Sequence, residues 1–372
     1  MRTVWVMPEI QQRRRDRLRA ELAATDADAA LITSGVNVRY LTGLASSNAA
    51  VLVPAAGGAV LATDSRYALT AEAEAPDTEL VVTRAVEAGL AALAAERGLT
   101  RLAYEAHEMT VERRDELAAA GGLGLRPLGR VVEELRVVKD PAELALLGQA
   151  CALTGQAFDR VAPDITAGMT ERQLAVLIER AMIEAGADRP AFDTIVASGP
   201  NGAIPHHEPG GRAFAPGDLI TIDCGARVGG YHADMTRTVV LGPPADWQRE
   251  VYGLVAAAQR AGIAAAVPGA GAAEVDAAAR DVIEQAGYGE FFSHGLGHGV
   301  GLEIHEAPAL GPGRPGRLAD RVPITVEPGI YLPGRGGVRI EDTLVVRSGT
   351  PPAPPDLLTM TTTATGRELL VL

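Results

Sequence analysis

A pair of aspartates flanks a short glycine-containing turn in this chain. Asp223 ends the apolar run DLITID, Asp234 opens the run DMTRTVV, and ARVGG at 226–230 lies between them. Strand-like segments on both sides of such a turn predict a β-hairpin. A turn centred near Val228–Gly229 would place the two aspartates directly opposite one another, roughly 4.5–5.5 Å apart at Cβ. Like charges at that spacing repel, and a cation between them would turn the repulsion into attraction.

A pair of glutamates repeats this arrangement further along the chain. Glu327 and Glu341 flank the PGRGG segment at 333–337. A lone carboxylate is usually a solvated surface group, but the apolar neighbours at 324–326 and Val338 argue against exposed positions here. Four carboxylates that converge without a metal ion would destabilise the fold, so the two hairpins predict a metal site.

Between the two pairs lies the glycine-rich segment FFSHGLGHGVGLEIHE, which carries His294, His298 and His305. One imidazole among several carboxylate oxygens suits Mn²⁺, Co²⁺ or Zn²⁺ better than it suits a thiolate-type zinc site. Four carboxylates are more than one divalent ion needs, whereas two ions about 3.5–4 Å apart use that charge well. The pattern therefore predicts a hydrolytic centre with two divalent metal ions.

Composition narrows the class of protein around this centre. The length of 372 residues predicts about two domains. The formal net charge of −13 argues against nucleic acid or an anionic membrane as the main partner. Basic residues are 33 arginines and one lysine, Lys139, a bias that we interpret as genome composition and not as function.

Cysteine usage and the lack of long apolar runs indicate the compartment. Cys151 and Cys224 provide no disulfide framework, so a reducing cytoplasm is expected. The first twenty residues, MRTVWVMPEIQQRRRDRLRA, contain too short an apolar run for a signal peptide. No stretch reaches the roughly 18–20 uninterrupted apolar residues of a membrane span.

Residues 1–135 predict a small α/β domain without a catalytic constellation of its own. Helical patterns occur at 13–24, 86–97 and 110–120, and buried-strand patterns at 29–33, 50–54 and 80–83. The polar-aromatic segments YLTG at 40–43 and TDSRY at 63–67 read as loops.

A second domain, expected at 140–365, begins after a boundary near Val137–Asp140. Asp140, Pro141 and Glu143 form a capping-box pattern that opens a helix, and Thr170 with Gln173 opens another, which ends at Gly186. That second helix is expected to carry Leu174, Leu177, Ile178 and Met182 on one face. Further helices are expected at 246–262 and 273–286, and strands at 193–198, 218–223, 234–241, 323–327 and 339–346. This mixture predicts an α+β domain around an antiparallel sheet.

Several motifs in this order resemble the metallopeptidase family that includes methionine aminopeptidase, aminopeptidase P and prolidase. The matching stretches are PNGAIPHH, DLITIDCGARVGGYHADMTRT, HGLGHGVGLEIHE, VEPGIY and GVRIEDT, within 199–343. LRVVKDPAELALL, NVRYLTGL and LATDSRY are similar to the linker and the creatinase-type N-terminal domain of the proline-specific members. The resemblance implies a pita-bread catalytic domain preceded by that smaller α/β domain. It covers all but the ends of the chain, and the combination is highly specific although GHG or HE alone is weak.

The resemblance implies a role for each residue of the metal centre. Five positions match the family's ligands without departure: Asp223, Asp234, His298, Glu327 and Glu341. Asp234 and Glu341 would bridge two ions, most plausibly Mn²⁺, with Co²⁺ or Zn²⁺ as alternatives. Asp223 would complete the first site, and His298 with Glu327 the second.

Other residues match positions around the ligands in the family. His206, His294 and His305 match its active-site histidines, and Tyr331 and Arg339 match positions that support the site in the proline-specific enzymes. His206 and His305 would stabilise the oxyanion, and His294 would help to shape the pocket for the proline ring.

Four further residues have weaker patterns. His207 adjoins His206, and if both lie on a strand their side chains point opposite ways, which leaves contact with substrate as the less favoured reading. His232 is expected to make local hydrogen bonds, and His107 to be an ordinary residue of the N-terminal domain. Cys224 follows a ligand and is expected to be a small core residue.

The implied reaction is hydrolysis of the Xaa–Pro bond in short peptides by a cytoplasmic homodimer. A water acidified by two cations would attack the carbonyl, and Glu327 would accept and relay its proton. Two alternatives stay open: a metal hydrolase acting on a non-proline amide, and a non-catalytic binding protein on the same fold. Aminopeptidase and dipeptidase activity differ by whether a group grips the dipeptide carboxylate, for which Arg212, Arg335 and Arg339 are candidates.

Overall fold

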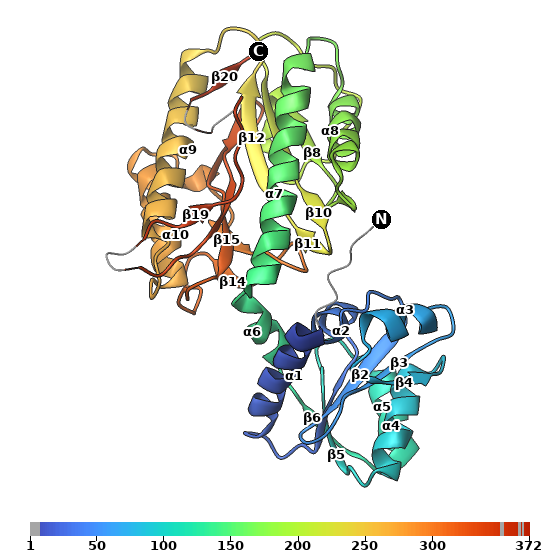
Figure 1. The fold of residues 1–372 in the computed structure, drawn as a ribbon. Coiled ribbons are helices and arrows are strands. Elements are labelled where there is room, and N and C mark those ends of the chain that lie inside the picture. The colour runs from blue at the N-terminus through green and yellow to red at the C-terminus, as the bar shows by residue number, and fades with distance from the viewer. Residues whose placement is uncertain (1–7, 350–352, 364–365, 367) are drawn as a thin grey trace. The chain divides into compact units, whose positions relative to one another are not determined.

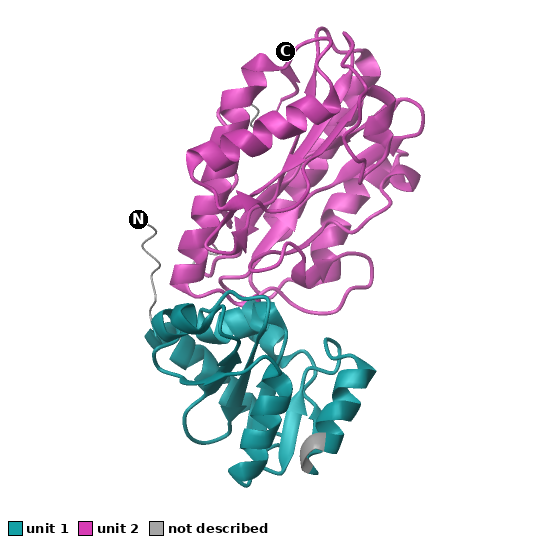
Figure 2. Cartoon of the chain, turned by 90° about the vertical axis from the view of Figure 1, so that its right-hand side faces the viewer, with its two compact units in different colours: residues 1–136 teal, residues 137–372 magenta. Residues whose placement is uncertain are grey.

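The computed structural model describes residues 8–349, 353–363, 366 and 368–372. The chain divides into two compact units, Met1–Arg136 and Val137–Leu372 (Figure 2). The start of the chain, on which the signal-peptide expectation rests, lies partly outside the described residues, as do 350–352 and 364–365 of the expected catalytic domain. None of the helices in the described part has the length and apolar character that crossing a bilayer requires.

The first unit is an α/β domain built on a mixed six-stranded sheet of order β4-β3-β2-β1-β5-β6. Its strands are β1 (Ala29–Ile32), β2 (Ala49–Pro54), β3 (Val60–Thr63), β4 (Glu79–Val82), β5 (Arg101–Tyr104) and β6 (Gly124–Pro127). Its helices are α1 (Pro8–Leu22), α2 (Gly35–Thr42), α3 (Ala68–Glu74), α4 (Val86–Glu96), α5 (Val111–Gly121) and α6 (Val131–Val137), the last of which ends at the boundary.

The loop expected at 40–43 is wrong. Tyr40 and Leu41 are fully buried in α2, and Gly43 caps that helix with a left-handed φ of 89°. A residue without a Cβ adopts this conformation easily, so Gly43 ends the helix instead of opening a loop. Four-residue strands carry little periodic signal, and of the five in this sheet only β1 and β4 were anticipated.

The second unit holds several sheets between two pairs of long helices (Figure 1). The larger sheets have the orders β20-β12-β9-β8 and β14-β13-β15-β18-β19, and the smaller ones β11-β10-β7 and β16-β17. Nearly all neighbouring strands run antiparallel, which agrees with the expected α+β class. The helices are α7 (Pro141–Val161), α8 (Glu171–Ala185), α9 (Asp246–Ala265) and α10 (Ala272–Gln285).

The strands of this unit have the following bounds. They are β7 (Arg189–Pro190), β8 (Ile195–Ser198), β9 (Leu219–Cys224), β10 (Ala226–Val228), β11 (Tyr231–His232), β12 (Met235–Val240) and β13 (Gly297–Gly299). The rest are β14 (Glu306–Leu310), β15 (Pro323–Val326), β16 (Gly329–Leu332), β17 (Gly336–Arg339), β18 (Asp342–Val345), β19 (Asp356–Leu357) and β20 (Leu370–Val371). Short 3-10 turns lie at Ala162–Asp164, Gly199–Ala203 and Gly289–Phe291.

Local sequence signals set the starts of α7 and α8. Asp140 accepts from the backbone N–H groups of Ala142 and Glu143 while Glu143 reaches back to the Asp140 N–H, which confirms the first capping box. Thr170 and Gln173 confirm the second. The expected buried face of α8 is wrong at one position, because Leu177 is 38% exposed.

The four helices cover two apolar clusters. The side chains of α7 and α8 pack on β8, β9 and β12, and those of α9 and α10 pack mainly on β15 to β18. Each half therefore has its own core, and the strands that carry the predicted ligands lie between the two helix pairs.

The two carboxylate hairpins differ in register. Asp223 lies opposite Thr236 and not opposite Asp234, because the turn is centred on Gly229–Gly230 instead of Val228–Gly229. Both glycines have positive φ, as a tight two-residue turn requires. The aspartates are therefore diagonal neighbours, which corrects the sequence expectation.

The glutamate hairpin follows the expected register. Val326 pairs with Asp342 and Gly329 pairs with Arg339, so Glu327 and Glu341 occupy facing positions between these two ladders. The strand expected at 339–346 is interrupted at Ile340-Glu341, and this interruption places Glu341 directly before the first residue of β18.

Candidate metal centre and active site

A cavity of about 760 Å³ in the second unit gathers the five predicted ligands. Asp223 comes from β9, Asp234 from the residue before β12, and His298 from β13. Glu327 follows β15 and Glu341 precedes β18. Strands separated by up to about a third of the chain thus deliver four carboxylates and one imidazole to one place.

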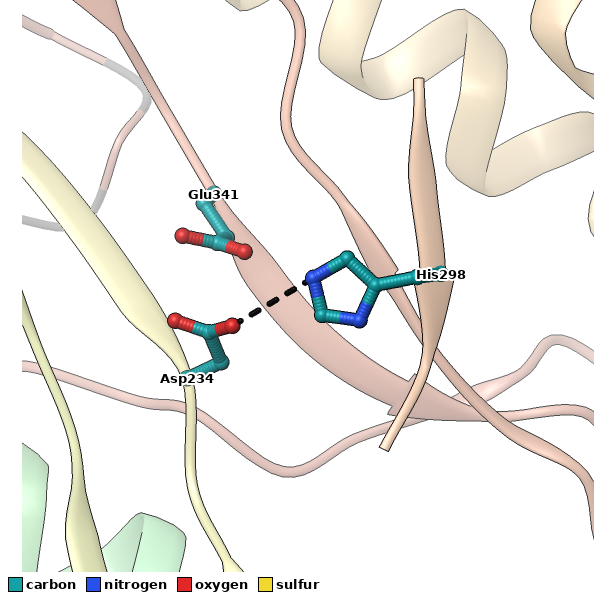
Figure 3. A group of neighbouring side chains, drawn as sticks. All are labelled: Asp234, His298 and Glu341. Atoms are coloured by element: carbon teal, nitrogen blue, oxygen red, sulfur yellow. Dashed lines mark ion pairs between the residues drawn. The ribbon is translucent and has the colours of Figure 1, made fainter. Parts of the chain in front are cut away.

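Three of these side chains are close enough to share one ion. Donor atoms of Asp234, His298 and Glu341 all lie within 4.8 Å of one another. Figure 3 shows the two carboxylates and the imidazole turned toward a common point. His298 Nε2 also lies 3.5 Å from Asp234 Oδ2 and 3.4 Å from Glu327 Oε1.

The hydrogen bonds of His298 fix which ring nitrogen faces the carboxylates. Nδ1 lies 2.9 Å from the Gly299 carbonyl oxygen, which can only accept, so Nδ1 carries the proton. Burial lowers the pKa of His298 to about 4, so the ring is neutral near pH 7. Nε2 therefore presents a lone pair to the carboxylate cluster, as a metal ligand must.

The carboxylates carry a large electrostatic penalty when no cation is present. Burial, and then the charges of neighbouring carboxylates, raise the pKa of Asp234 and of Glu341 well above the usual range. Burial also raises the pKa of Glu327 to about 8, against the opposing effect of Arg339. A divalent cation would offset this penalty, so the donor set suits one.

Among the described residues, hydrogen-bond donors contact only one of the two carboxylate oxygens of Asp223. Its Oδ2 accepts a 2.7 Å hydrogen bond from Arg339 Nη2. Its Oδ1 is buried and has no hydrogen-bond partner within the part of the chain that the structure describes. A buried carboxylate oxygen without a donor is costly, so Oδ1 is a natural ligand atom for a cation.

Thr236 and Arg339 join the two hairpins beneath the ligands. Thr236 Oγ1 donates to Glu341 Oε2 at 2.7 Å and accepts from Arg339 Nε at 3.1 Å. Thr236 is the residue that faces Asp223 across the ladder, so the diagonal register leaves room for a hydroxyl that orients a ligand from the other hairpin. Sequence reasoning did not single out Thr236.

A directed chain of hydrogen bonds runs from Arg339 to His294. Arg339 Nη1 donates to Tyr331 Oη at 3.0 Å, and Tyr331 Oη lies 2.8 Å from His294 Nε2. His294 Nδ1 donates to the Gly295 carbonyl oxygen at 2.7 Å, so Nε2 must accept from the tyrosine. Burial lowers the pKa of His294 to about 4. Both nitrogens are thus occupied, and His294 offers the cavity a fixed, neutral ring face.

His206, His207 and His305 also line the cavity. His305 packs edge-on against His298, with ring centroids 4.5 Å apart. The expectation that His206 and His207 lie on a strand with opposed side chains is wrong, because both lie in a loop after the 3-10 turn at Gly199–Ala203. A loop has no two-residue alternation, so both rings reach the same cavity.

A buried glutamate that sequence reasoning passed over holds this loop. Glu171, the first residue of α8, accepts from His207 Nε2 at 2.8 Å and from the Gly210 N–H at 3.1 Å. Its other oxygen accepts from the N–H and hydroxyl of Ser198 and from Asn201 Nδ2. Burial alone would raise the pKa of Glu171, but these donors outweigh burial and hold its pKa below the usual value.

An ion pair on α10 holds the segment that carries His294. Arg280 pairs with Asp276 and donates to the carbonyl oxygens of Phe292 and His294. Asp276 accepts from the Leu296 N–H at 2.9 Å. Both residues look like an ordinary i,i+4 surface pair in the sequence, so their attachment to this segment had no local signal.

The remaining singled-out residues lie elsewhere among the described residues. His232 makes hydrogen bonds as expected, but its partner is not local, because Nδ1 lies 3.0 Å from the carbonyl oxygen of Gly301, 69 positions away. His107 contacts Glu133 in the first unit. Cys224 is fully buried in the core, and burial raises the pKa of its thiol, which agrees with the expected small-core role.

Two of the three arginines considered for binding a carboxylate are not among the described residues that line the cavity. Arg212 is bidentate to Asp218, and Arg335 stacks on Trp247. Arg339 lines the cavity, but its donors are taken by Thr236, Pro205, Tyr331 and Asp223.

Both units match known families. Residues 145–348 match Metallopeptidase family M24, and residues 14–138 match the Creatinase/Prolidase N-terminal domain. The chain belongs to this metallopeptidase family, with a creatinase-type domain before the pita-bread catalytic domain, and it is a metallopeptidase.

Individual relatives match over most of the chain. The uncharacterized peptidase YqhT of Bacillus subtilis is 37% identical over 333 residues, 89% of this chain and 94% of that protein. The Xaa-Pro dipeptidase from Bacillus anthracis superposes with a TM-score of 0.92 at 34% identity, over 97% of this chain and 100% of that one. The X-Pro aminopeptidase from Thermotoga maritima superposes with a TM-score of 0.88 at 34% identity, over 96% and 99%.

Proposed function

We propose that this protein hydrolyses the peptide bond that precedes proline in short peptides, with two divalent metal ions bound per chain. The observation that carries the proposal is the convergence of four carboxylates and a neutral imidazole on one cavity, with a buried Asp223 oxygen left without a donor. The proposed ligands are Asp223, Asp234, His298, Glu327 and Glu341. The proline preference is supported by similarity to proteins named Xaa-Pro dipeptidase and X-Pro aminopeptidase.

The donor set favours Mn²⁺, with Co²⁺ or Zn²⁺ as alternatives. Eight carboxylate oxygens and one nitrogen are hard or borderline ligands, and the two cysteines are free and buried. When bound, the ions supply Lewis-acid chemistry, lowering the pKa of a water and polarising the scissile carbonyl group.

Residues of the chain itself are assigned to stabilise the oxyanion, to transfer a proton and to contact the proline ring. His305 and His206, both exposed within the cavity, are positioned to donate to the oxygen of the tetrahedral intermediate. Glu327, which lines the cavity with its Oε1 3.4 Å from His298 Nε2, is the group we assign to accept and relay a proton. The fixed ring of His294 and the phenol of Tyr331 form an uncharged wall against which a proline ring can pack.

The cavity also offers a cation for the end of a dipeptide. Arg314 lines it, its side chain is exposed, and it has no carboxylate partner among the described residues. A carboxylate bound there would favour substrates that end at proline. We therefore place dipeptides ahead of longer peptides as substrates.

A single comparison tests the proposal. Under equal Mn²⁺ loading, an Xaa–Pro dipeptide should be cleaved more efficiently than its Xaa–Ala counterpart, because alanine leaves part of an apolar pocket unfilled. A few methylenes are worth roughly 10–200-fold in kcat/KM. Exhaustive chelation should abolish both activities, and Mn²⁺ or Co²⁺ should restore them. Equal rates would favour a hydrolase of non-proline amides, and full activity without metal would overturn the metal centre.

We further infer that the protein is a cytoplasmic homodimer. The first unit exposes the apolar side chains of Leu69 (82%) and Val111 (77%). We assign the association of two copies to this unit, in which we find no catalytic group. Size-exclusion chromatography with light scattering tests this, and a monomer at micromolar concentration would contradict it.

A further inference from the structure

The single lysine of the chain occupies a buried position next to the active-site segment. Of 34 basic residues, 33 are arginines, and the exception is Lys139. Its side chain is 1% exposed, and Nζ lies 2.7 Å from Glu306 Oε2, whose side chain is 5% exposed. A bias that has placed arginine at every other basic position has left lysine at this one.

The Lys139–Glu306 pair is packed tightly against the backbone. The pair lies against the backbone of Gly301, where a Cβ atom would be 2.8 Å from Lys139 Cε and 2.8 Å from Glu306 Oε2. No side chain separates the pair from that backbone. Arginine and lysine exchange easily on a surface, but a planar guanidinium needs more room than a compact ammonium group.

Glu306 closes the loop between β13 and β14. Its Oε1 accepts from the Glu303 N–H at 3.0 Å, and the Gly301 N–H donates to the Glu303 carbonyl oxygen at 3.0 Å. Its backbone pairs with Gly299 after a bulge in the ladder. The Glu306 carboxylate therefore holds the loop together through its bond to Glu303. Lys139 connects that carboxylate to the segment before α7.

This loop determines where His305 lies. His305 directly precedes Glu306, and it is exposed, so its own side-chain packing holds it little beyond the edge-on contact with His298. The Lys139 N–H donates to the Arg321 carbonyl oxygen at 3.0 Å, which anchors the lysine to the segment before β15. His305 is thus connected to the rigid part of the domain through its neighbour Glu306.

We propose that Lys139 and Glu306 are positioning residues that hold His305 against the metal centre. Neither is among the described residues that line the cavity, so they act through His305 and not on substrate. The inference rests on the proposed role of His305 in hydrolysis. Breaking a buried pair leaves an uncompensated charge, so in Lys139→Met the Glu306 carboxylate must move toward water and take the loop with it.

A double-mutant cycle separates positioning from plain stability. We expect Lys139→Met to lower kcat on an Xaa–Pro dipeptide by about 10–100-fold, the scale of a displacement near 1 Å, with KM and metal content little changed. In a His305→Ala background the same substitution should change kcat less than about twofold, because the group it positions is gone. Additive losses in the cycle would overturn the proposal.

Further variants keep the test decisive if Lys139→Met folds poorly. Glu306→Gln retains the shape of the side chain and should give the same coupling to His305→Ala. Lys139→Arg should also lower kcat, since a planar guanidinium is larger than the compact ammonium group that lies against the Gly301 backbone. Arg180→Met, in the exposed pair with Glu184, is the matched control and should leave kcat unchanged.

A readout independent of activity completes the design. In the ¹H–¹³C spectrum of the metal-free protein, the ring signal that disappears in His305→Ala belongs to His305. Lys139→Met should shift or broaden that signal more than the His107 signal of the first unit, and an unmoved His305 signal would overturn the inference. If His305→Ala keeps full activity, its proposed role fails, and the ring signal still decides whether Lys139 holds it in place.

Discussion

Arg339 Nη2 lies 2.7 Å from Asp223 Oδ2, and both side chains are almost completely buried. The same guanidinium also reaches Thr236, Tyr331 and the Pro205 carbonyl oxygen. Its hydrogen bonds therefore connect three parts of the site: the hairpin of Asp223 and Asp234, the hairpin of Glu327 and Glu341, and the loop that carries His206 and His207. Its planar donors suit this task, whereas a lysine could reach one partner at a time.

Replacement of Arg339 by Met should strongly destabilise the metal-free protein. The substitution leaves Asp223 buried without a counter-charge, which typically costs about 3–5 kcal/mol. Urea unfolding followed by circular dichroism measures this free energy. Arg97→Met is the control, because the Arg97–Glu79 pair is exposed and is worth roughly 0.2–1 kcal/mol. Equal losses for the two variants would contradict the assigned role of Arg339.

Metal-free protein should lose stability as the pH rises from about 6.5 to 8. The pKa of Glu327 is raised to about 8 in the folded chain, and those of Asp234 and Glu341 are raised well above their usual range by burial and by neighbouring carboxylates, so the folded state binds more protons than the unfolded state in this window. His298 and His294, with pKa values lowered to about 4, act in the opposite sense, but their effect is complete above their ordinary value of 6.5.

Thermal unfolding at several pH values tests this dependence. The increase in Tm on adding Mn²⁺ should grow between pH 6.5 and pH 8, because the ions replace protons as the neutralising charge. A gain in Tm that is constant or that shrinks over this range would mean that the carboxylates do not converge as described.

Substitution of a proposed metal ligand and substitution of His305 should have different effects on metal content and on kcat. Asp234→Ala and Glu341→Ala should lower both bound metal and kcat, because each removes a carboxylate proposed to bridge the ions. His305→Ala should retain the metal but lose about 10²–10³-fold in rate as an oxyanion-type donor. Elemental analysis of each purified variant decides between the roles. Metal lost from His305→Ala and kept by Asp234→Ala would reverse the assignment.

Substitution of Glu171 by Gln should destabilise the loop that carries His206 and His207. Whichever way the amide turns, its nitrogen faces a backbone N–H, that of Ser198 on one side or that of Gly210 on the other. An unsatisfied buried donor costs roughly 1–3 kcal/mol, which urea unfolding can measure. The variant should also lose more kcat/KM than His207→Ala, because the loop is released along with the ring. Unchanged stability would show that the loop is held by other contacts.

Arg314 should control preference for peptide length. Arg314→Gln should lower kcat/KM for an Xaa–Pro dipeptide while leaving an Xaa–Pro–Yaa tripeptide nearly unchanged, since only the dipeptide places its carboxylate next to proline. Loss of one charge-assisted hydrogen bond predicts roughly a 10- to 100-fold effect. Parallel losses on both peptides would remove Arg314 from this role and favour aminopeptidase activity.

Much of the fold, and the presence of the five proposed ligands in one cavity, could be predicted because their signals are local. The capping boxes at Asp140 and Thr170 lie within four residues each, and they set the starts of two helices. The facing positions of Glu327 and Glu341 follow from strand alternation on either side of one glycine-rich turn. The motifs that resemble the family, within 199–343, lie inside the stretch 145–348 that matches it.

Among the expectations that were wrong, one concerns the position of a turn and one concerns a segment taken for a loop. A shift of one residue in the centre of the ARVGG turn moves the register by two, so Thr236 and not Asp234 faces Asp223. YLTG at 40–43 has the composition of a loop, but the burial of Tyr40 and Leu41 stabilises a helix there. Tertiary packing selected the helix at 40–43, whereas in the ARVGG segment the two adjacent glycines adopt the positive φ angles that a tight turn requires.

The sequence by itself determined which residues are candidates for the chemistry, since strand alternation, glycine turns and motif spacing act over a few residues. Only the tertiary structure decided what holds them: Glu171 beneath His207, Arg280 behind His294, and Lys139 beside Glu306. The residues of the last pair are 167 positions apart. No periodicity extends over such a separation, and the contact exists because the cores of the domain pack these segments against each other.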